Sequence, residues 1–197
     1  MKKLLLILLC VPMIGLGQTA DDYFNKAYDY AKNGEYQLAI DNYTKYLRID
    51  PDDTHAYHNR GLVYKELGNY KDAISDFTRA IRIDPDYTSA YNYRGIVYKY
   101  LKNYEDAIAD YTRAIRIDSD YFYAYYNRGI AYDDLGNHED AIADYTRAIR
   151  IDPGYANAYK NRGITKENAG LPYCSDYKRA CNLGKEKCCQ WYNSQCK

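Results

Sequence analysis

The sequence lacks net charge, because 27 lysine and arginine residues balance 27 aspartate and glutamate residues over 197 positions. A neutral chain does not offer the basic surface of a nucleic-acid-binding protein, so no nucleic-acid partner is expected. The sequence also lacks a nucleophile elbow, a phosphate-binding loop and a zinc motif, and we expect neither an enzyme nor a cofactor. His55 and His58 are three residues apart but have no third ligand beside them, so no metal site is predicted.

Phenylalanine and tryptophan are scarce, with three and one residues, whereas tyrosine occurs 27 times. Most of these tyrosines recur at corresponding positions of a repeat that is described below. We therefore predict that most of them are packing residues whose hydroxyl group reaches water.

Long apolar runs are absent after the first residues. Lys2 and Lys3 precede the apolar stretch 4–16, and small residues at 15 and 17 follow the pattern of a signal peptidase site. We expect residues 1–17 to be a signal peptide, and the mature chain to be periplasmic or secreted, without a membrane span. The alternative is a lipid anchor on Cys10, although Leu9 before it is larger than that modification prefers.

One pattern occurs four times. DAISDFTRAIRID begins at Asp72, DAIADYTRAIRID begins at Asp106 and Asp140, each 34 residues after the last, and a divergent copy begins at Leu38. A fixed period of this length indicates a stack of helical repeats. We place four repeats at 20–53, 54–87, 88–121 and 122–155, a shortened fifth at 156–183, and a cysteine-rich cap at 184–197.

Each repeat contains two segments with helical spacing of apolar residues. In the repeat 88–121 these are 90–101 and 104–117, separated by a break at Lys102 and Asn103. Neither helix can bury its apolar face alone, so neighbouring repeats must stack. The predicted fold is an all-α, right-handed superhelical solenoid of helix-turn-helix repeats with a cysteine-rich helical cap.

These residues resemble the tetratricopeptide repeat family. Its pattern of large, small and aromatic positions is matched in 54–87 by Tyr57, Gly61, Tyr64, Ala73, Phe77, Ala80 and Pro85. The next two repeats match equally well except for Ser119 in place of proline. The first repeat departs at Tyr46, where the family has alanine. The resemblance implies a scaffold that binds a protein or peptide partner.

An arginine and an aspartate recur outside the family pattern, on the first and second helix of each repeat. An arginine can grip a carboxylate with two hydrogen bonds, so we predict a ladder of ion pairs between these helices. The alternative is a row of substrate-binding arginines. The predicted pairs are Arg60–Asp76, Arg94–Asp110, Arg128–Asp144 and Arg162–Asp176.

The resemblance also implies a concave groove lined by the first helix of each repeat. The candidate partner contacts that it implies are His58, Lys65, Asn92, Lys99, Tyr100, Tyr123, Tyr126 and Asp133. Tyr100, Tyr123 and Tyr126 stand outside the packing pattern and are the best candidates for anchors, since tyrosine buries much area at low entropic cost. The alternative is that they only shield the helices. A subclass that binds chaperone tails needs asparagine where this chain has Leu62, Ile96 and Ile130, so that role is disfavoured.

Five cysteines lie in the last 24 residues. Cys174 and Cys181 are about 10 Å apart on one helix, too far for a disulfide. If Gly184 turns the chain into a second antiparallel helix, the register favours Cys174–Cys196 and Cys181–Cys189 and leaves Cys188 free. Other pairings are possible, and the odd cysteine could join a second chain. The bridges would staple the exposed end of the stack.

Three functions are compatible with these features. The first is an exported scaffold that holds a peptide or extended segment in its groove. The second is a structural component of a cell-envelope complex that docks by an edge or the convex face. The third, a thiol-redox protein, is less favoured because the sequence has no C-x-x-C motif.

Overall fold

The computed structural model describes residues 19–196, so the predicted signal peptide and Cys10 lie outside the described residues. Eleven α-helices and no strand occur within 19–196. Their bounds are α1 Ala20–Lys32, α2 Tyr36–Ile49, α3 Thr54–Glu66, α4 Tyr70–Ile83, α5 Thr88–Tyr100, α6 Tyr104–Ile117, α7 Phe122–Asp134, α8 His138–Ile151, α9 Ala156–Asn168, α10 Cys174–Asn182 and α11 Glu186–Gln195.

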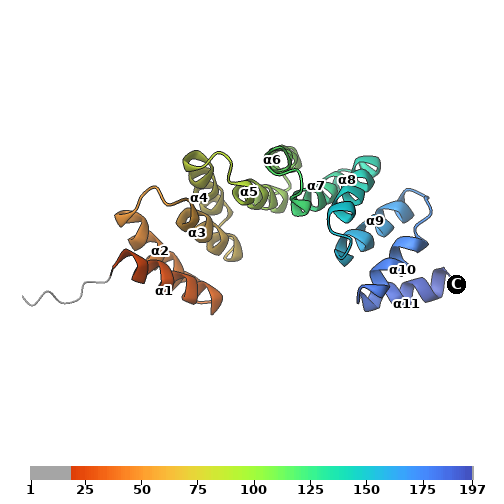
Figure 1. Cartoon of the computed structure of the whole chain (residues 1–197), viewed down its shortest axis with the longest axis horizontal. Coiled ribbons are helices and arrows are strands. Elements are labelled where there is room, and N and C mark those ends of the chain that lie inside the picture. Colours follow the sequence, from red (N-terminus) through yellow and green to blue (C-terminus); the bar gives the residue numbers. More distant parts are fainter. Residues whose placement is uncertain (1–18, 197) are drawn as a thin grey trace, which may run out of the picture.

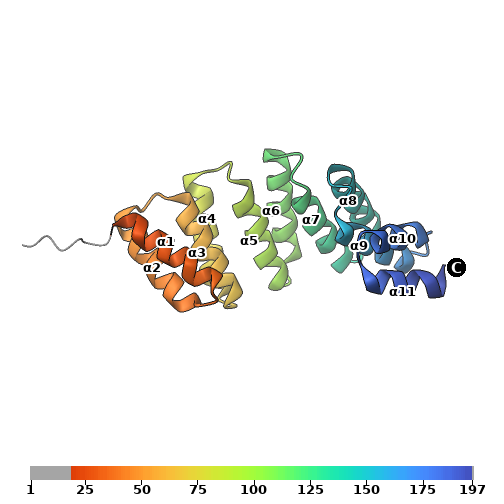
Figure 2. The same cartoon turned by 60° about the horizontal axis from the view of Figure 1, so that its bottom comes forward.

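Each helix packs against the next one in the chain, and the pairs stack into a solenoid (Figures 1 and 2). The stack forms an arch, with α4, α6 and α8 on its outer side and α3, α5, α7 and α9 on its inner side (Figure 1). Each odd-numbered helix from α1 to α7 also contacts the next odd-numbered helix. The predicted all-α solenoid is confirmed, and its inner surface consists of the first helices of the repeats.

Small residues allow the two helices of a repeat to approach closely. A Cβ atom on Gly95 would lie only 2.7 Å from the ring of Tyr111, and one on Gly61 would lie 2.9 Å from Phe77. Ala107 and Ala114, which flank the same contact, are fully buried. Glycine and alanine at these positions therefore set the spacing of the helix pairs, which leaves room for an aromatic ring between them.

The turns inside the repeats use a left-handed backbone conformation. Gly34, Gly68 and Gly136 have φ values of 79°, 76° and 79° at this turn, whereas Lys102 has φ 59° at the corresponding position. A residue with a Cβ atom is strained in this region, so Lys102 is the least favourable residue of the series.

The first repeat accommodates its unusual tyrosine. Tyr46 is almost fully buried, and its ring packs against Phe24 with the centroids 5.2 Å apart. Its hydroxyl donates to the Asp53 carboxylate over 2.6 Å. Because Asp53 also caps α3 through the backbone N–H of Ala56, Tyr46 links the first repeat to the second.

The C-terminal cap is a helical hairpin. Disulfides join Cys174 to Cys196 and Cys181 to Cys189, and Cys188 is a buried free thiol. Between the two helices, the Trp191 ring stacks on Tyr177 with the centroids 4.5 Å apart. The cap therefore covers the end of the array with an aromatic contact and two covalent links. Helix α10 begins at Cys174, two residues after Pro172.

Candidate functional site

The ladder residues lie between the two helices of each repeat. In the third repeat, Arg94 Nε donates to Asp110 Oδ2 over 2.8 Å, and Nη2 donates to Oδ1 over 2.7 Å. The same two-point contact occurs at Arg60–Asp76 and Arg128–Asp144. In the shortened fifth repeat, Arg162 contacts Asp176, and Lys166 donates to the same carboxylate over 2.8 Å.

A threonine from the preceding repeat completes each contact, and the sequence reasoning missed it. Arg94 Nη1 donates to Thr78 Oγ1 over 2.9 Å, so the arginine bridges α4 and α6. The signal was present, because a threonine stands 16 residues before every ladder arginine. These contacts are Arg60 to Thr44, Arg94 to Thr78, Arg128 to Thr112 and Arg162 to Thr146. The ladder therefore fixes each repeat against the one before it.

Tyrosine rings enclose the same arginines. The Arg94 guanidinium lies 5.7 Å from the ring of Tyr91 and 6.0 Å from that of Tyr98, and Arg113 lies on Tyr91 at 5.9 Å. This stacking recurs in the other repeats and accounts for many of the tyrosines. Only 14–17% of each ladder arginine side chain is exposed. The alternative of substrate-binding arginines is therefore not supported by the structure.

Two of the predicted groove residues are buried, which corrects the expectation that they form surface contacts. Only 6% of His58 is exposed, because its ring is enclosed by Phe77, Tyr87 and Tyr93. This burial lowers the pKa of His58 to about 4, so the ring is neutral at pH 7.

Asn92 is the second of these buried residues, with 3% of it exposed. Its Oδ1 accepts a hydrogen bond from Asn127 Nδ2 over 2.9 Å, which joins α5 to α7. The inner helices are thus connected by side chains that a sequence reading would place on the surface.

Tyr100 and Tyr123 are exposed on the inner helices, by 55% and 45%. The Tyr100 ring stacks nearly parallel on the Tyr70 ring, with the centroids 5.7 Å apart. Lys99 Nζ lies 5.4 Å from the centroid of the same Tyr100 ring. Tyr126 is only half-buried, and its hydroxyl accepts from Asn161 over 3.1 Å. Two of the three predicted anchors therefore have about half of their surface exposed, and the third is held by a hydrogen bond to α9.

Charge changes sign along the ends of the inner helices. Lys65 and Lys99 lie in the last turns of α3 and α5, whereas the corresponding residues of α7 and α9 are Asp133 and Glu167. Lys65 forms an ion pair with Glu66, and Asp133 contacts His138 Nδ1 over 3.0 Å. At this position the residue is thus lysine in α3 and α5 and acidic in α7 and α9, but only 16% of the Lys65 side chain is exposed and Glu167 accepts a hydrogen bond from the Tyr177 hydroxyl.

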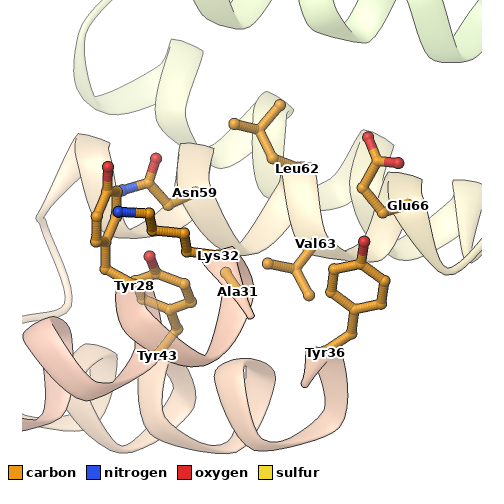
Figure 3. Close-up of a pocket in the computed structure, with 9 residues that line it drawn as sticks. All are labelled: Tyr28, Ala31, Lys32, Tyr36, Tyr43, Asn59, Leu62, Val63 and Glu66. Atoms are coloured by element: carbon orange, nitrogen blue, oxygen red, sulfur yellow. The ribbon is translucent and has the colours of Figure 1, made fainter. Parts of the chain in front are cut away.

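A cavity of about 320 Å³ opens beside the first two inner helices (Figure 3). Tyr28 and Lys32 of α1 and Tyr36 of α2 face Asn59 and Glu66 of α3 across it (Figure 3). Tyr28 is 55% exposed. Tyr43 lines the cavity, and burial raises the pKa of its hydroxyl to about 12 while a hydrogen bond with Asn59 opposes the rise.

The sequence reasoning omitted this cavity because it began the groove at the second repeat. The available signal was Tyr28, which occupies in the first repeat the position of Leu62 in the second.

Within residues 19–196, no helix is long and apolar enough to cross a bilayer. In the same range, no group of three or more histidine, cysteine, aspartate or glutamate side chains is arranged to hold a metal ion.

The fold and the repeated helix pairs define a helical-repeat solenoid, and comparison with known families places it more closely. Tetratricopeptide repeat models match residues 55–87, 77–109 and 122–155, and a TPR repeat model matches 27–68 and 97–136. The chain belongs to the tetratricopeptide repeat family. No curated protein sequence matches it.

Solved structures of the same fold include several forms of MamA. One MamA crystal structure is 29% identical, has a TM-score of 0.74, and covers 87% of this chain and 95% of its own. MamA from Desulfovibrio magneticus RS-1 is 22% identical, with a TM-score of 0.71 and coverage of 89% and 96%. YrrB, described as a tetratricopeptide repeat protein with an unusual peptide-binding site, is 24% identical, with a TM-score of 0.66 and coverage of 85% and 87%.

Proposed function

We propose that this protein is an exported scaffold that binds an extended segment of a partner protein along its inner face. The observation that carries the proposal is the exposure of three tyrosines on the inner helices: Tyr28, Tyr100 and Tyr123 are each 45–55% exposed. Exposed tyrosines are frequent anchors of protein interfaces, because the ring buries area and the hydroxyl still forms a hydrogen bond. YrrB has a peptide-binding site on the same fold, but the support for this chain comes from its own surface.

The charge distribution on the inner face also predicts how the partner is oriented. An extended segment with an acidic end and a basic end would place its acidic end near Lys99 and its basic end near Asp133. Electrostatic complementarity of this kind fixes orientation and speeds association more than it adds affinity. The expected association rate therefore falls as salt is added.

Export is part of the proposal and has two supports. The N-terminal sequence follows the signal-peptide pattern, and the cap contains two disulfides, which persist in oxidising compartments. A thiol-redox role receives less support, because Cys188 is buried and burial raises the pKa of its thiol, which disfavours the reactive thiolate.

A second candidate function is docking by the edge of the arch. Its support is a row of exposed leucines at the turns within the repeats: Leu67, Leu101 and Leu135 are 42%, 50% and 41% exposed. Such a row could contact a flat partner surface in a larger envelope assembly. It contains no aromatic anchor, so we favour the inner face.

The two functions can be separated by two double variants of the whole mature protein. Tyr100→Ala with Tyr123→Ala removes the anchors, and Leu67→Gln with Leu135→Gln alters the edge by a comparable exposed area. Partners captured from an envelope extract by the unaltered protein should be lost with the tyrosine variant and retained with the leucine variant. The opposite pattern would replace groove binding by edge docking, and circular dichroism checks that both variants are folded.

A further inference from the structure

The cavity beside α1, α2 and α3 lies where the first repeat packs on the second, and the next interface along the chain offers a direct comparison. A shift by the repeat period of 34 residues gives, for each residue that lines the cavity, its counterpart between the second and third repeats. Three counterparts have larger side chains: Lys65 for Ala31, Tyr93 for Asn59 and Tyr100 for Glu66. The cavity therefore exists because the first interface has small side chains where the second has large ones.

At the second interface the chain's own aromatic rings fill this space. The Tyr100 ring stacks on Tyr70 with the centroids 5.7 Å apart, and the two rings are 11° from parallel. The Tyr93 ring stacks on Phe77 with the centroids 6.2 Å apart, and the Lys65 amine lies 5.7 Å from the Tyr93 centroid. These contacts join α5 to both helices of the preceding repeat. The second interface thus shows that aromatic rings fit the space between successive repeats.

At the first interface the rings on the outer helix are present, but the rings that stack on them are missing. Tyr36 and Tyr43 occupy the positions of Tyr70 and Phe77, and both line the cavity of about 320 Å³. Figure 3 shows Tyr36 on one side of the cavity and Tyr43 on the other, with Val63 between them. This volume is at the lower end of the range for ligand sites, which is about 300–1,000 Å³, so it fits one large side chain.

Asn59 lacks the partner that its counterparts in the fourth and fifth repeats have. Those counterparts donate a hydrogen bond to the inner helix of the preceding repeat: Asn127 to Asn92 over 2.9 Å and Asn161 to the Tyr126 hydroxyl over 3.1 Å. For Asn59 the corresponding partner position is Phe24, whose side chain has no acceptor. Asn59 forms a hydrogen bond with the Tyr43 hydroxyl instead. Because an amide can form several hydrogen bonds, Asn59 keeps capacity for a polar group of a ligand.

The cavity also has a cation without a carboxylate partner. Lys32 is exposed and lines the cavity, and within residues 19–196 no carboxylate lies within ion-pair distance of its amine. Glu66, the acidic residue of the lining, is paired with Lys65. The unpaired positive charge favours an acidic residue beside the group that enters the cavity.

We propose that this cavity binds an aromatic side chain of the partner's extended segment, with its ring stacked on Tyr36 and with an acidic residue of the segment beside Lys32. The bound ring takes the place that the Tyr100 ring has on Tyr70 in the next repeat. The inference rests on the proposed function, because it names the residue by which the partner segment is anchored at the first repeats.

The test uses the acetylated and amidated tripeptide Asp-Phe-Asp as a probe, in NMR titration of the whole protein. The methyl signals of Leu62 and Val63, which line the cavity, should shift on binding. The control peptide Asp-Leu-Asp should bind about two- to tenfold more weakly, because it cannot stack on Tyr36. A second control, Asn-Phe-Asn, should bind about two- to fivefold more weakly than the probe, and added salt should reduce this difference.

Variants that fill the cavity from within test its location. Asn59→Tyr combined with Glu66→Tyr gives the first interface the rings of the second, so binding of the probe should be abolished. Ala31→Lys supplies only the side chain of Lys65 and should also abolish binding, which gives a second test if the double variant does not fold. The matched control is Asp134→Tyr, which places a tyrosine at the position of Glu66 in the fourth repeat and should leave binding unchanged.

Equal binding of the phenylalanine and leucine peptides, or unchanged binding of the probe to a folded cavity-filling variant, would overturn the proposal. If no peptide binds but the captured partner is still lost with the Tyr100 and Tyr123 double variant, the cavity does not hold an aromatic anchor and the inner-face function stands. If capture survives both that double variant and the cavity-filling variants, both proposals fail.

Discussion

Replacing Arg94 by methionine tests whether the ion-pair ladder holds the repeats together. The substitution leaves the Asp110 carboxylate, which is 7% exposed, without the two hydrogen bonds that it receives from Arg94. It also removes the bond to Thr78 that links α4 to the pair. Breaking a buried pair in this way costs about 3–5 kcal/mol, so we expect a loss of that size in the free energy of unfolding at pH 7.

The pH dependence of this loss has a defined sign. Burial raises the pKa of Asp110, and the hydrogen bonds from Arg94 oppose that rise. Without Arg94 the pKa in the folded state rises further, so the folded protein takes up a proton at a pH where the unfolded chain is still ionised. Lowering the pH from neutral toward the ordinary aspartate pKa should therefore stabilise the folded variant and reduce its deficit relative to the unaltered protein.

The assay is urea unfolding followed by circular dichroism at several pH values. Adding Asp110→Leu to Arg94→Met should recover about 2–3 kcal/mol, because no buried charge then remains unpaired. The control is Arg116→Met, an exposed arginine in the last turn of α6, which should cost less than about 1 kcal/mol. A loss below about 1 kcal/mol for Arg94→Met, or a loss that does not depend on pH, would refute the reasoning.

Further substitutions test the local geometry and the cap. Gly95→Ala should lower the free energy of unfolding by about 1–2 kcal/mol, because the added Cβ would lie 2.7 Å from the Tyr111 ring. Gly163→Ala, whose added Cβ would have its nearest contact at 3.4 Å, should leave this free energy unchanged or raise it by up to about 1 kcal/mol. Thermal unfolding measures both effects. Lys102→Gly should raise the free energy of unfolding by about 0.5–1 kcal/mol, because glycine adopts the left-handed conformation at this position without strain. An unchanged melting temperature would contradict this. Peptide mapping without reduction should find Cys174–Cys196 and Cys181–Cys189, and any bridge to Cys188 would contradict the register of the cap.

The fold was predictable because the same helical pattern of apolar residues recurs in each repeat. The segment predicted at 104–117 coincides with α6, and the antiparallel register of the cap follows from the positions of four cysteines and one glycine. Both depend on contacts that are close in sequence or repeated at a fixed spacing, which a single sequence records directly.

The inner face was less predictable because exposure depends on neighbouring repeats. His58 and Lys65 occupy equivalent faces of α3, yet the ring of Tyr93 from the next repeat encloses His58. Thr78 looks like an ordinary surface residue until Arg94 of the following repeat reaches it. A sequence gives the helix face on which a residue lies, but the side chains that cover that face come from elsewhere in the chain.

Hydrogen exchange measured by mass spectrometry, on the protein alone and with its captured partner, tests the central claim most directly. Binding along the inner face predicts slower exchange in α3, α5, α7 and α9, strongest around Tyr100 and Tyr123, with little change in the outer helices. Protection confined to α4, α6 and α8, or to the turns that carry Leu67, Leu101 and Leu135, would contradict the account.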